Sequence, residues 1–123
     1  MTGVQTCALP ISEKLRDVDL MLPEKTGSLP DMLTEIRWNL DWMLKMQDES
    51  GGVWHKATTA KFPGSILPES DSARMLIVGS GEAPYLTTQA TCNLVAVTAI
   101  ASRVYRPFDP EYANRCLSAA RLG

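Results

Sequence analysis

The most constraining feature of this sequence is a segment that predicts a helix and whose middle turns have no charged side chain on any face. Residues 88–105 predict a helix, and within it residues 94–101 (LVAVTAIA) include no charged side chain. A helix without a charged face is buried on nearly all sides. The many small residues in the segment would also allow neighbouring helices to approach closely. We therefore expect this helix to be surrounded by several others.

A second helix is predicted over residues 29–48, where apolar side chains recur at helical spacing. They form two stripes, one of which carries Trp38, Trp42 and Met46 at intervals of four residues. A lone surface helix shows a single stripe, so two stripes predict contacts on two sides. We accordingly expect Trp38 and Trp42 to lie in the core.

A third helix is predicted to begin at Pro110, with Asp109 as its N-cap. A long connection over residues 53–86, rich in proline and glycine, separates the first two helices. Loops of this length inside a compact domain are usually functional. No strand-rich region competes with the helices, so the predicted class is all-α, with about three helices and a long loop.

Composition excludes several classes of protein. The 123 residues leave room for one domain at most, and a net charge of -2 provides no basic surface for nucleic acid. The longest charge-free stretch, residues 83–102, is too polar for a membrane-spanning helix. Cys7, Cys92 and Cys116 form no CxxC motif or Cys/His cluster, so no zinc site or redox motif is indicated.

The first eleven residues have a different character from the rest. Residues 2–11 read TGVQTCALPI, which resembles the in-frame translation of a common DNA sequencing adapter. The alternatives are a native strand and a signal peptide, but a signal peptide would need a basic segment and a longer apolar core. We therefore divide the chain into residues 1–11, adapter-derived and not native, and residues 12–123, an internal fragment of a larger domain.

Residues 19–120 resemble the catalytic domain of glycoside hydrolase family 9, the cellulase and endoglucanase family. The motifs that carry this resemblance stand in the family's order and spacing. Leu22-Pro23-Glu24 resembles I-P-E, residues 41–47 fit D-W-x-L-K-M-Q, residues 51–56 resemble G-G-V-Y-H-K and residues 87–91 resemble S-T-x-A-T. The stretch 75–86 departs most from the family pattern.

We expect this chain to be part of a longer protein, here called the parent protein. The resemblance implies a fold and a reaction for that parent protein. The fold would be an (α/α)6 barrel, the six-hairpin toroid of paired inner and outer helices, of which this chain forms a part. The reaction would be hydrolysis of β-1,4-glucosidic bonds in a β-glucan with inversion, which requires a carboxylate base and a carboxylic acid. In the family these groups lie in an upstream aspartate-pair motif and a downstream glutamate. Neither motif occurs in this sequence, so we expect no catalytic residue here and no activity from this chain alone.

The resemblance also implies candidate substrate-binding residues in the long loop. His55 would border the sugar-binding cleft, with a structural role in holding the loop as the alternative. Trp54 and Phe62 could stack on glucose rings, with ordinary loop packing as the alternative. We predict no cofactor or metal site in the chain, although calcium is known in some relatives, and Glu69 and Asp71 are weak candidate ligands. The parent protein would be extracellular by family habit, since this chain carries no export signal of its own.

Two other classes of protein remain as alternatives at this stage. The helix beginning at Asp109-Pro110 would suit a helical-repeat interaction module, although no repeat period of suitable length recurs along the chain. Another six-hairpin glycosidase or a polysaccharide lyase would share the architecture but not the reaction.

Overall fold

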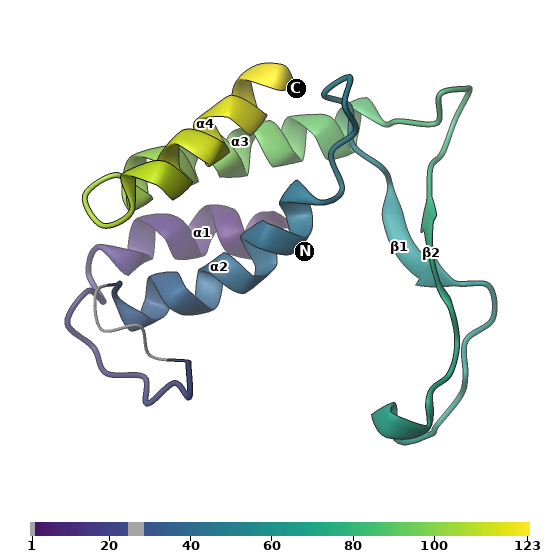
Figure 1. Ribbon diagram of the computed structural model, residues 1–123, viewed down its shortest axis with the longest axis horizontal. Coiled ribbons are helices and arrows are strands. Elements are labelled where there is room, and N and C mark those ends of the chain that lie inside the picture. The colour runs from purple at the N-terminus through teal and green to yellow at the C-terminus, as the bar shows by residue number, and fades with distance from the viewer. Residues whose placement is uncertain (1, 25–28) are drawn as a thin grey trace.

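In the described part of the chain, four helices form one body and a two-stranded arm projects from it (Figure 1). The computed structural model describes the backbone of residues 2–24 and 29–123 and the side chains of residues 7–24 and 29–123. In chain order the elements are α1 (Thr2–Ser12), α2 (Asp31–Leu44), β1 (Lys56–Thr59), the 3₁₀ turn η1 (Pro68–Ser70), β2 (Met75–Val78), α3 (Thr88–Tyr105) and α4 (Pro110–Leu122). None of the described helices is long and apolar enough to cross a membrane.

Helices α3 and α4 form the predicted hairpin, and both start where the sequence places a capping residue. The Thr87 hydroxyl accepts a hydrogen bond from the Ala90 amide at 3.2 Å. The Asp109 carboxylate accepts one from the Tyr112 amide at 2.9 Å, and Pro110 follows as the first helical residue. Each cap satisfies an amide that the first turn would leave without a partner. The predicted bounds of α3 and the predicted start of α4 are confirmed.

The core lies where α3 meets the other three helices. Its largest fully buried side chains come from all four helices, and they are Tyr105, Leu9, Leu33, Leu40, Leu94, Val97, Thr98 and Cys116. The Thr98 hydroxyl donates to the Leu94 carbonyl oxygen of its own helix at 2.7 Å, which is how a buried threonine satisfies its hydrogen-bonding group. The Tyr105 hydroxyl donates to the Leu33 carbonyl oxygen at 2.5 Å and joins α3 to α2.

The prediction that α3 is buried on nearly all sides is wrong for one face. Gln89, Cys92, Ala96 and Arg103 are exposed, and their spacing places them on one side of the helix. The described helices cover the opposite side only. Residues 94–101 carry no charge, yet the described helices leave one face of α3 uncovered.

Helix α2 is shorter than predicted and presents only one of its stripes to the core. It ends at Leu44 rather than Asp48, because Gln47 turns away to pair with Val53 in an antiparallel bridge. The expectation that Trp38 and Trp42 lie in the core is also wrong, since 65% and 42% of their surfaces are exposed. The packed helices cover the stripe that holds Leu33 and Leu40, whereas in the second stripe Met46 is buried and the two tryptophans are not.

A set of polar contacts connects α2 to the start of α4. The Arg37 guanidinium donates to the Asp109 carboxylate at 2.8 Å and lies 4.0 Å from the centroid of the Tyr112 ring. Asp41 lies 3.7 Å from the same guanidinium and accepts a hydrogen bond from Arg115 at 3.3 Å. The pKa of the Asp109 carboxyl is lowered by the Tyr112 amide and by Arg37. The N-cap of α4 thus also joins two helices.

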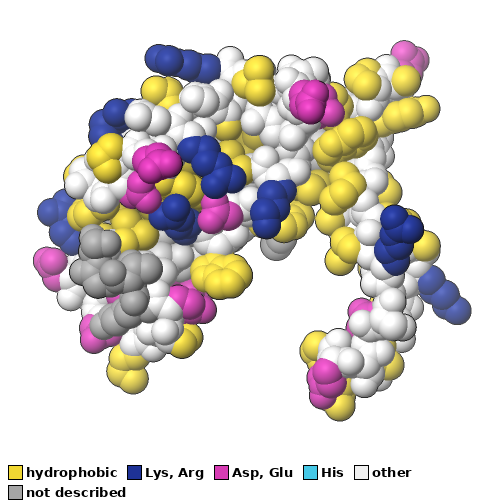
Figure 2. All heavy atoms as spheres, viewed as in Figure 1, with side chains coloured by type: hydrophobic (Ala, Val, Ile, Leu, Met, Phe, Trp, Pro, Cys, Tyr) yellow, Lys and Arg dark blue, Asp and Glu magenta, His cyan; other side chains and the backbone are white. Residues whose placement is uncertain are grey.

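The long connection is not only a loop, which corrects the all-α prediction. Strands β1 and β2 pair antiparallel, with Lys56 opposite Val78 and Thr59 opposite Met75. Figure 2 shows the arm standing away from the helical body, with hydrophobic side chains along it. Phe62, Leu67, Met75 and Ile77 are each more than half exposed. The arm therefore offers a largely uncovered apolar surface.

Helix α1 consists almost entirely of residues 2–11, the segment that resembles a translated sequencing adapter. Leu9 is fully buried in the common core, and the Ser12 hydroxyl donates to the Leu9 carbonyl oxygen at 2.6 Å. The helix packs mainly against α3 and less extensively against α2. Residues 2–12 therefore have a defined place in the fold, whatever their origin.

Candidate functional site

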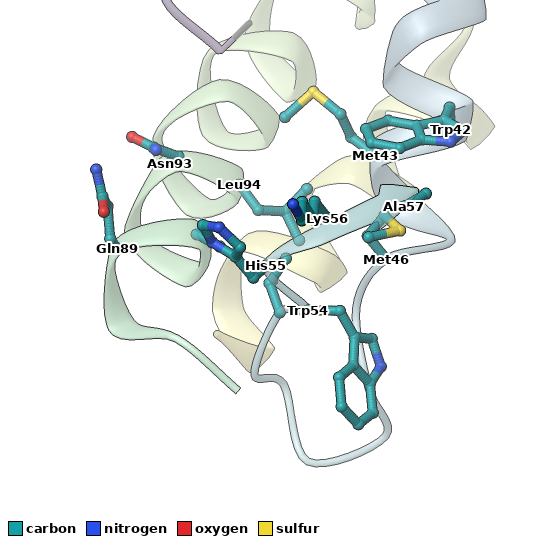
Figure 3. Close-up of a pocket in the computed structure, with 12 residues that line it drawn as sticks. Trp42, Met43, Met46, Trp54, His55, Lys56, Ala57, Gln89, Asn93 and Leu94 are labelled. Atoms are coloured by element: carbon teal, nitrogen blue, oxygen red, sulfur yellow. The ribbon is translucent and has the colours of Figure 1, made fainter. Parts of the chain in front are cut away.

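A pocket of about 470 Å³ lies between α2, the segment leading into β1, and the start of α3 (Figure 3). It is called the Trp54 pocket below. Twelve described residues line it: Trp42, Met43, Met46, Val53, Trp54, His55, Lys56, Ala57, Gln89, Ala90, Asn93 and Leu94. It lies where the arm leaves the helical body, which is also where the longest predicted loop begins.

Val53 fixes the segment that forms one wall of the pocket. Its side chain is buried, its amide donates to the Thr91 hydroxyl at 3.0 Å, and its carbonyl oxygen accepts from the Thr87 amide at 3.1 Å. The Trp54 amide in turn donates to the Met46 carbonyl oxygen at 3.1 Å. These bonds attach residues 53–54 to the segment that follows α2 and to the start of α3. Trp54 and His55 are therefore held on an anchored backbone.

The turn before Val53 depends on a glycine. Gly51 has φ +95°, and a Cβ atom placed there would lie 2.1 Å from the Leu122 carbonyl oxygen. A side chain would both strain this backbone and collide with the end of α4. The Gln47 side chain also spans the turn, donating to the carbonyl oxygens of Gly51 and Ala119, each at 3.0 Å. The G-G pair in the sequence thus sets the position of the pocket wall.

The chemistry of the pocket suits a ligand with both apolar faces and hydroxyl groups. Met43, Met46 and Leu94 provide an apolar surface, while the amides of Gln89 and Asn93 supply donors and acceptors. Figure 3 shows these two amides beside His55 on one side of the pocket. Sugar rings have this dual character, since their CH faces stack on aromatic rings and their hydroxyls hydrogen-bond.

No carboxylate is found among the described residues that line the pocket. A glycosidase of the two-carboxylate type needs an acid and a base on either side of the scissile bond. The pocket can therefore hold a ligand but contains neither of these groups. That the catalytic residues lie outside the chain stays a prediction.

The three predicted site residues do not lie together. Trp54 and His55 both line the pocket, with Trp54 half-buried and His55 exposed. Figure 3 shows the Trp54 indole pointing away from the imidazole of His55, as expected for successive residues in extended chain. Phe62 is not among the lining residues, and 80% of its surface is exposed on the arm. A sugar-stacking role for Phe62 remains a prediction.

Ten of the twelve described lining residues were not predicted as site residues, and Gln89, Asn93 and Trp42 are the most informative of them. Gln89 and Asn93 are four positions apart at the start of α3, so both project from one face of that helix. Trp42 was assigned to the core but lies at the edge of the pocket. The spacing of the two amides was a usable signal, although only the tertiary structure brings β1 and α3 together.

Metal ligation finds no geometric support in the described part of the chain. Among the residues that the structure describes, no group of three or more His, Cys, Asp or Glu side chains is placed to hold a metal ion. Glu69 lies in η1 and Asp71 directly follows it, both exposed at the far end of the arm. These two carboxylates do not form a calcium site by themselves.

Comparison with known proteins identifies the family. The family model for glycosyl hydrolase family 9 matches residues 12–122. The chain belongs to glycosyl hydrolase family 9. This match decides against the helical-repeat and polysaccharide-lyase alternatives. It also begins at Ser12, directly after the segment that resembles a sequencing adapter.

Individual relatives agree with this membership. The chain is 42% identical to Endoglucanase D of Acetivibrio thermocellus over 112 residues, which are 89% of this chain and 17% of that protein. It is 37% identical to a xyloglucan-specific endo-β-1,4-glucanase of Bacteroides ovatus over 103 residues, 80% of this chain and 16% of the relative. The crystal structure of a metagenome-derived glycoside hydrolase family 9 endoglucanase matches with a TM-score of 0.83 and 36% identity, covering 98% of this chain and 22% of that chain. The present chain therefore spans only about a fifth of the length of each of these relatives.

Proposed function

We propose that this chain is a segment of a cellulase-type glycoside hydrolase that cleaves β-1,4-glucosidic bonds in a β-glucan with inversion. Within the parent protein, the segment would form part of an (α/α)6 barrel and contribute to the sugar-binding surface. The proposal is supported above all by the family match, together with relatives whose names specify endoglucanase action. The parent protein would be extracellular, and the chain itself would require no cofactor.

The proposed role of the Trp54 pocket is to bind and orient sugar, not to transfer protons. His55 would hydrogen-bond a sugar hydroxyl, Trp54 would stack on a ring, and Gln89 and Asn93 would contact further hydroxyls. The pocket is lined by aromatic and amide groups and contains no carboxylate among its described residues. Inversion requires two carboxyl groups far enough apart to admit water, so both would come from segments outside this chain. Accordingly, the chain alone would not hydrolyse a glucan.

A chimaera tests this proposal directly. Residues 12–122 would replace the corresponding segment of Endoglucanase D, to which the chain is 42% identical. We expect the folded chimaera to hydrolyse carboxymethylcellulose, and NMR of the first product to show the α-anomer that inversion at a β-linkage requires. A folded chimaera without activity, or one that first releases the β-anomer, would refute the proposal.

Two substitutions in the chimaera test the pocket. His55→Ala should lower kcat/KM by about tenfold, which corresponds to the loss of one hydrogen bond to the substrate. Glu111→Gln, at an exposed position on α4, is the matched control and should leave the kinetics unchanged. If His55→Ala and Glu111→Gln gave equal kinetics, His55 would have no role in sugar binding.

A further inference from the structure

Lys56 gives the Trp54 pocket a charge that the proposed sugar contacts do not use. It is the one lysine or arginine among the twelve described lining residues, and no aspartate or glutamate is among them. Lys56 stands at the first position of β1, where its backbone pairs with Val78 of β2. Figure 3 shows its side chain in the middle of the lining residues, between those of α2 and those of α3. The paired backbone thus fixes the base of a cationic side chain in the pocket wall.

The charge of Lys56 is not neutralised within the described part of the chain. The ion pairs of the described residues lie between α2 and α4, and none of them involves Lys56. An ammonium group has three hydrogen-bond donors and no acceptor, and it is strongly hydrated in water. Hydrogen bonds from such a group to an ionised acceptor are roughly twice as strong as those between neutral groups. Lys56 would therefore bind a carboxylate better than a sugar hydroxyl.

The other lining groups restrict what kind of acid the pocket could take. The Trp54 indole suits the CH face of a sugar ring, and the amides of Gln89 and Asn93 suit ring hydroxyls. A glucose unit oxidised at C6 keeps its CH faces and its ring hydroxyls, and it gains a carboxylate outside the ring. Such a unit would use the apolar surface, the amides and the cation together, whereas neutral glucose would leave the cation without an opposite charge.

We propose that Lys56 gives the Trp54 pocket a preference for β-glucan units that carry a carboxylate over neutral glucose units. This inference rests on the proposed function, because it assumes that the pocket binds sugar. It makes Lys56 a residue that selects the substrate and assigns it no part in bond cleavage. Lys56 is exposed, and exposed ion pairs are weak, so the preference should be about two- to fivefold in Kd.

The test compares two ligands of equal length on the full 123-residue chain. They are cellotetraose and the same tetrasaccharide oxidised at C6 to glucuronate units. NMR titration gives Kd, and the side-chain amide signals of Gln89 and Asn93 report binding in the pocket. Lys56→Gln removes the charge and keeps a polar side chain. Lys61→Gln, at an exposed position outside the pocket, is the matched control. Each titration is run at about 0.01 M and about 1 M salt, because salt screens an exposed charge pair.

The original chain and Lys61→Gln should bind the acidic tetrasaccharide about two- to fivefold more tightly than cellotetraose at low salt, and equally at high salt. Lys56→Gln should bind both ligands equally and keep the original affinity for cellotetraose. Equal binding of the two ligands by the original chain, or a preference that survives in Lys56→Gln, would overturn this inference and leave the proposed sugar binding intact. Binding of neither ligand would refute the sugar-binding role of the pocket and this inference with it.

Discussion

Two buried tyrosines in contact offer a matched test of the core. The rings of Tyr105 and Tyr112 meet edge to face with centroids 4.9 Å apart, yet their hydroxyls have different surroundings. Tyr105 donates to the Leu33 carbonyl oxygen, whereas the Tyr112 hydroxyl is buried with no hydrogen-bond partner among the described residues. Replacing each tyrosine by phenylalanine removes one oxygen atom and leaves the ring.

The two substitutions should have different effects on the free energy of unfolding. Tyr105→Phe removes a buried hydrogen bond and should cost about 1 kcal/mol, because such bonds contribute about 0.5–1.5 kcal/mol net. The Leu33 carbonyl keeps the bond from its own helix, so no larger penalty arises. Tyr112→Phe removes a hydroxyl that loses its water on folding without compensation, so stability should stay the same or rise by up to about 2 kcal/mol.

Chemical denaturation and thermal melting, followed by circular dichroism, measure both effects. For a chain of this size, about 1 kcal/mol corresponds to a shift in Tm of roughly 3–6 °C. We expect Tyr105→Phe to melt lower than the original chain and Tyr112→Phe to melt at the same temperature or higher. If Tyr112→Phe destabilised the chain as much as Tyr105→Phe, the difference in hydrogen bonding that the structure shows would be refuted.

Three further predictions concern charge, thiol reactivity and the uncovered face of α2. The lowered pKa of Asp109 means that its carboxylate stabilises the fold above the ordinary value of 3.8 and that this contribution is lost as the pH falls through the lower folded pKa. Asp109→Asn should therefore lower Tm at neutral pH, with the difference from the original chain shrinking below a pH of about 4; a constant difference across pH would contradict this. Burial raises the pKa of the Cys116 thiol to about 11, so an alkylating reagent at pH 8 should modify exposed Cys7 and Cys92 quickly and Cys116 only on unfolding, as mass spectrometry can show. Trp38 is 65% exposed, so Trp38→Gln should reduce concentration-dependent association in sedimentation velocity, and an unchanged distribution would show that this face does not associate.

Local signals in the sequence were sufficient for α3 and α4. The charge-free run indicated α3, and Asp109 before Pro110 marks the start of α4 by capping chemistry, which depends only on nearby residues. The periodicity of α2 predicted two buried stripes, and the one that holds Leu33 and Leu40 does reach the core. Its end was missed because Gln47 leaves the helix to pair with Val53, and no local pattern announces that pairing.

Features that depend on contacts between distant segments were not predictable in the same way. Apolar periodicity shows that Trp38 and Trp42 suit burial, but it does not show whether a neighbour is present to bury them. Strands β1 and β2 are each four residues long and lack a clear alternation of polar and apolar side chains, so they were included in the loop. The placement of His55 beside Gln89 and Asn93 arises only when the chain turns at residues 51–52.

The central claim is that this family 9 segment carries a sugar-contacting pocket but no catalytic carboxylates. The most direct measurement is the release of reducing sugar from carboxymethylcellulose by the purified 123-residue chain, assayed beside the Endoglucanase D chimaera. We predict release by the chimaera and none by the chain alone. Hydrolysis by the chain alone, abolished when one of its own carboxylates is replaced by the matching amide, would contradict the claim.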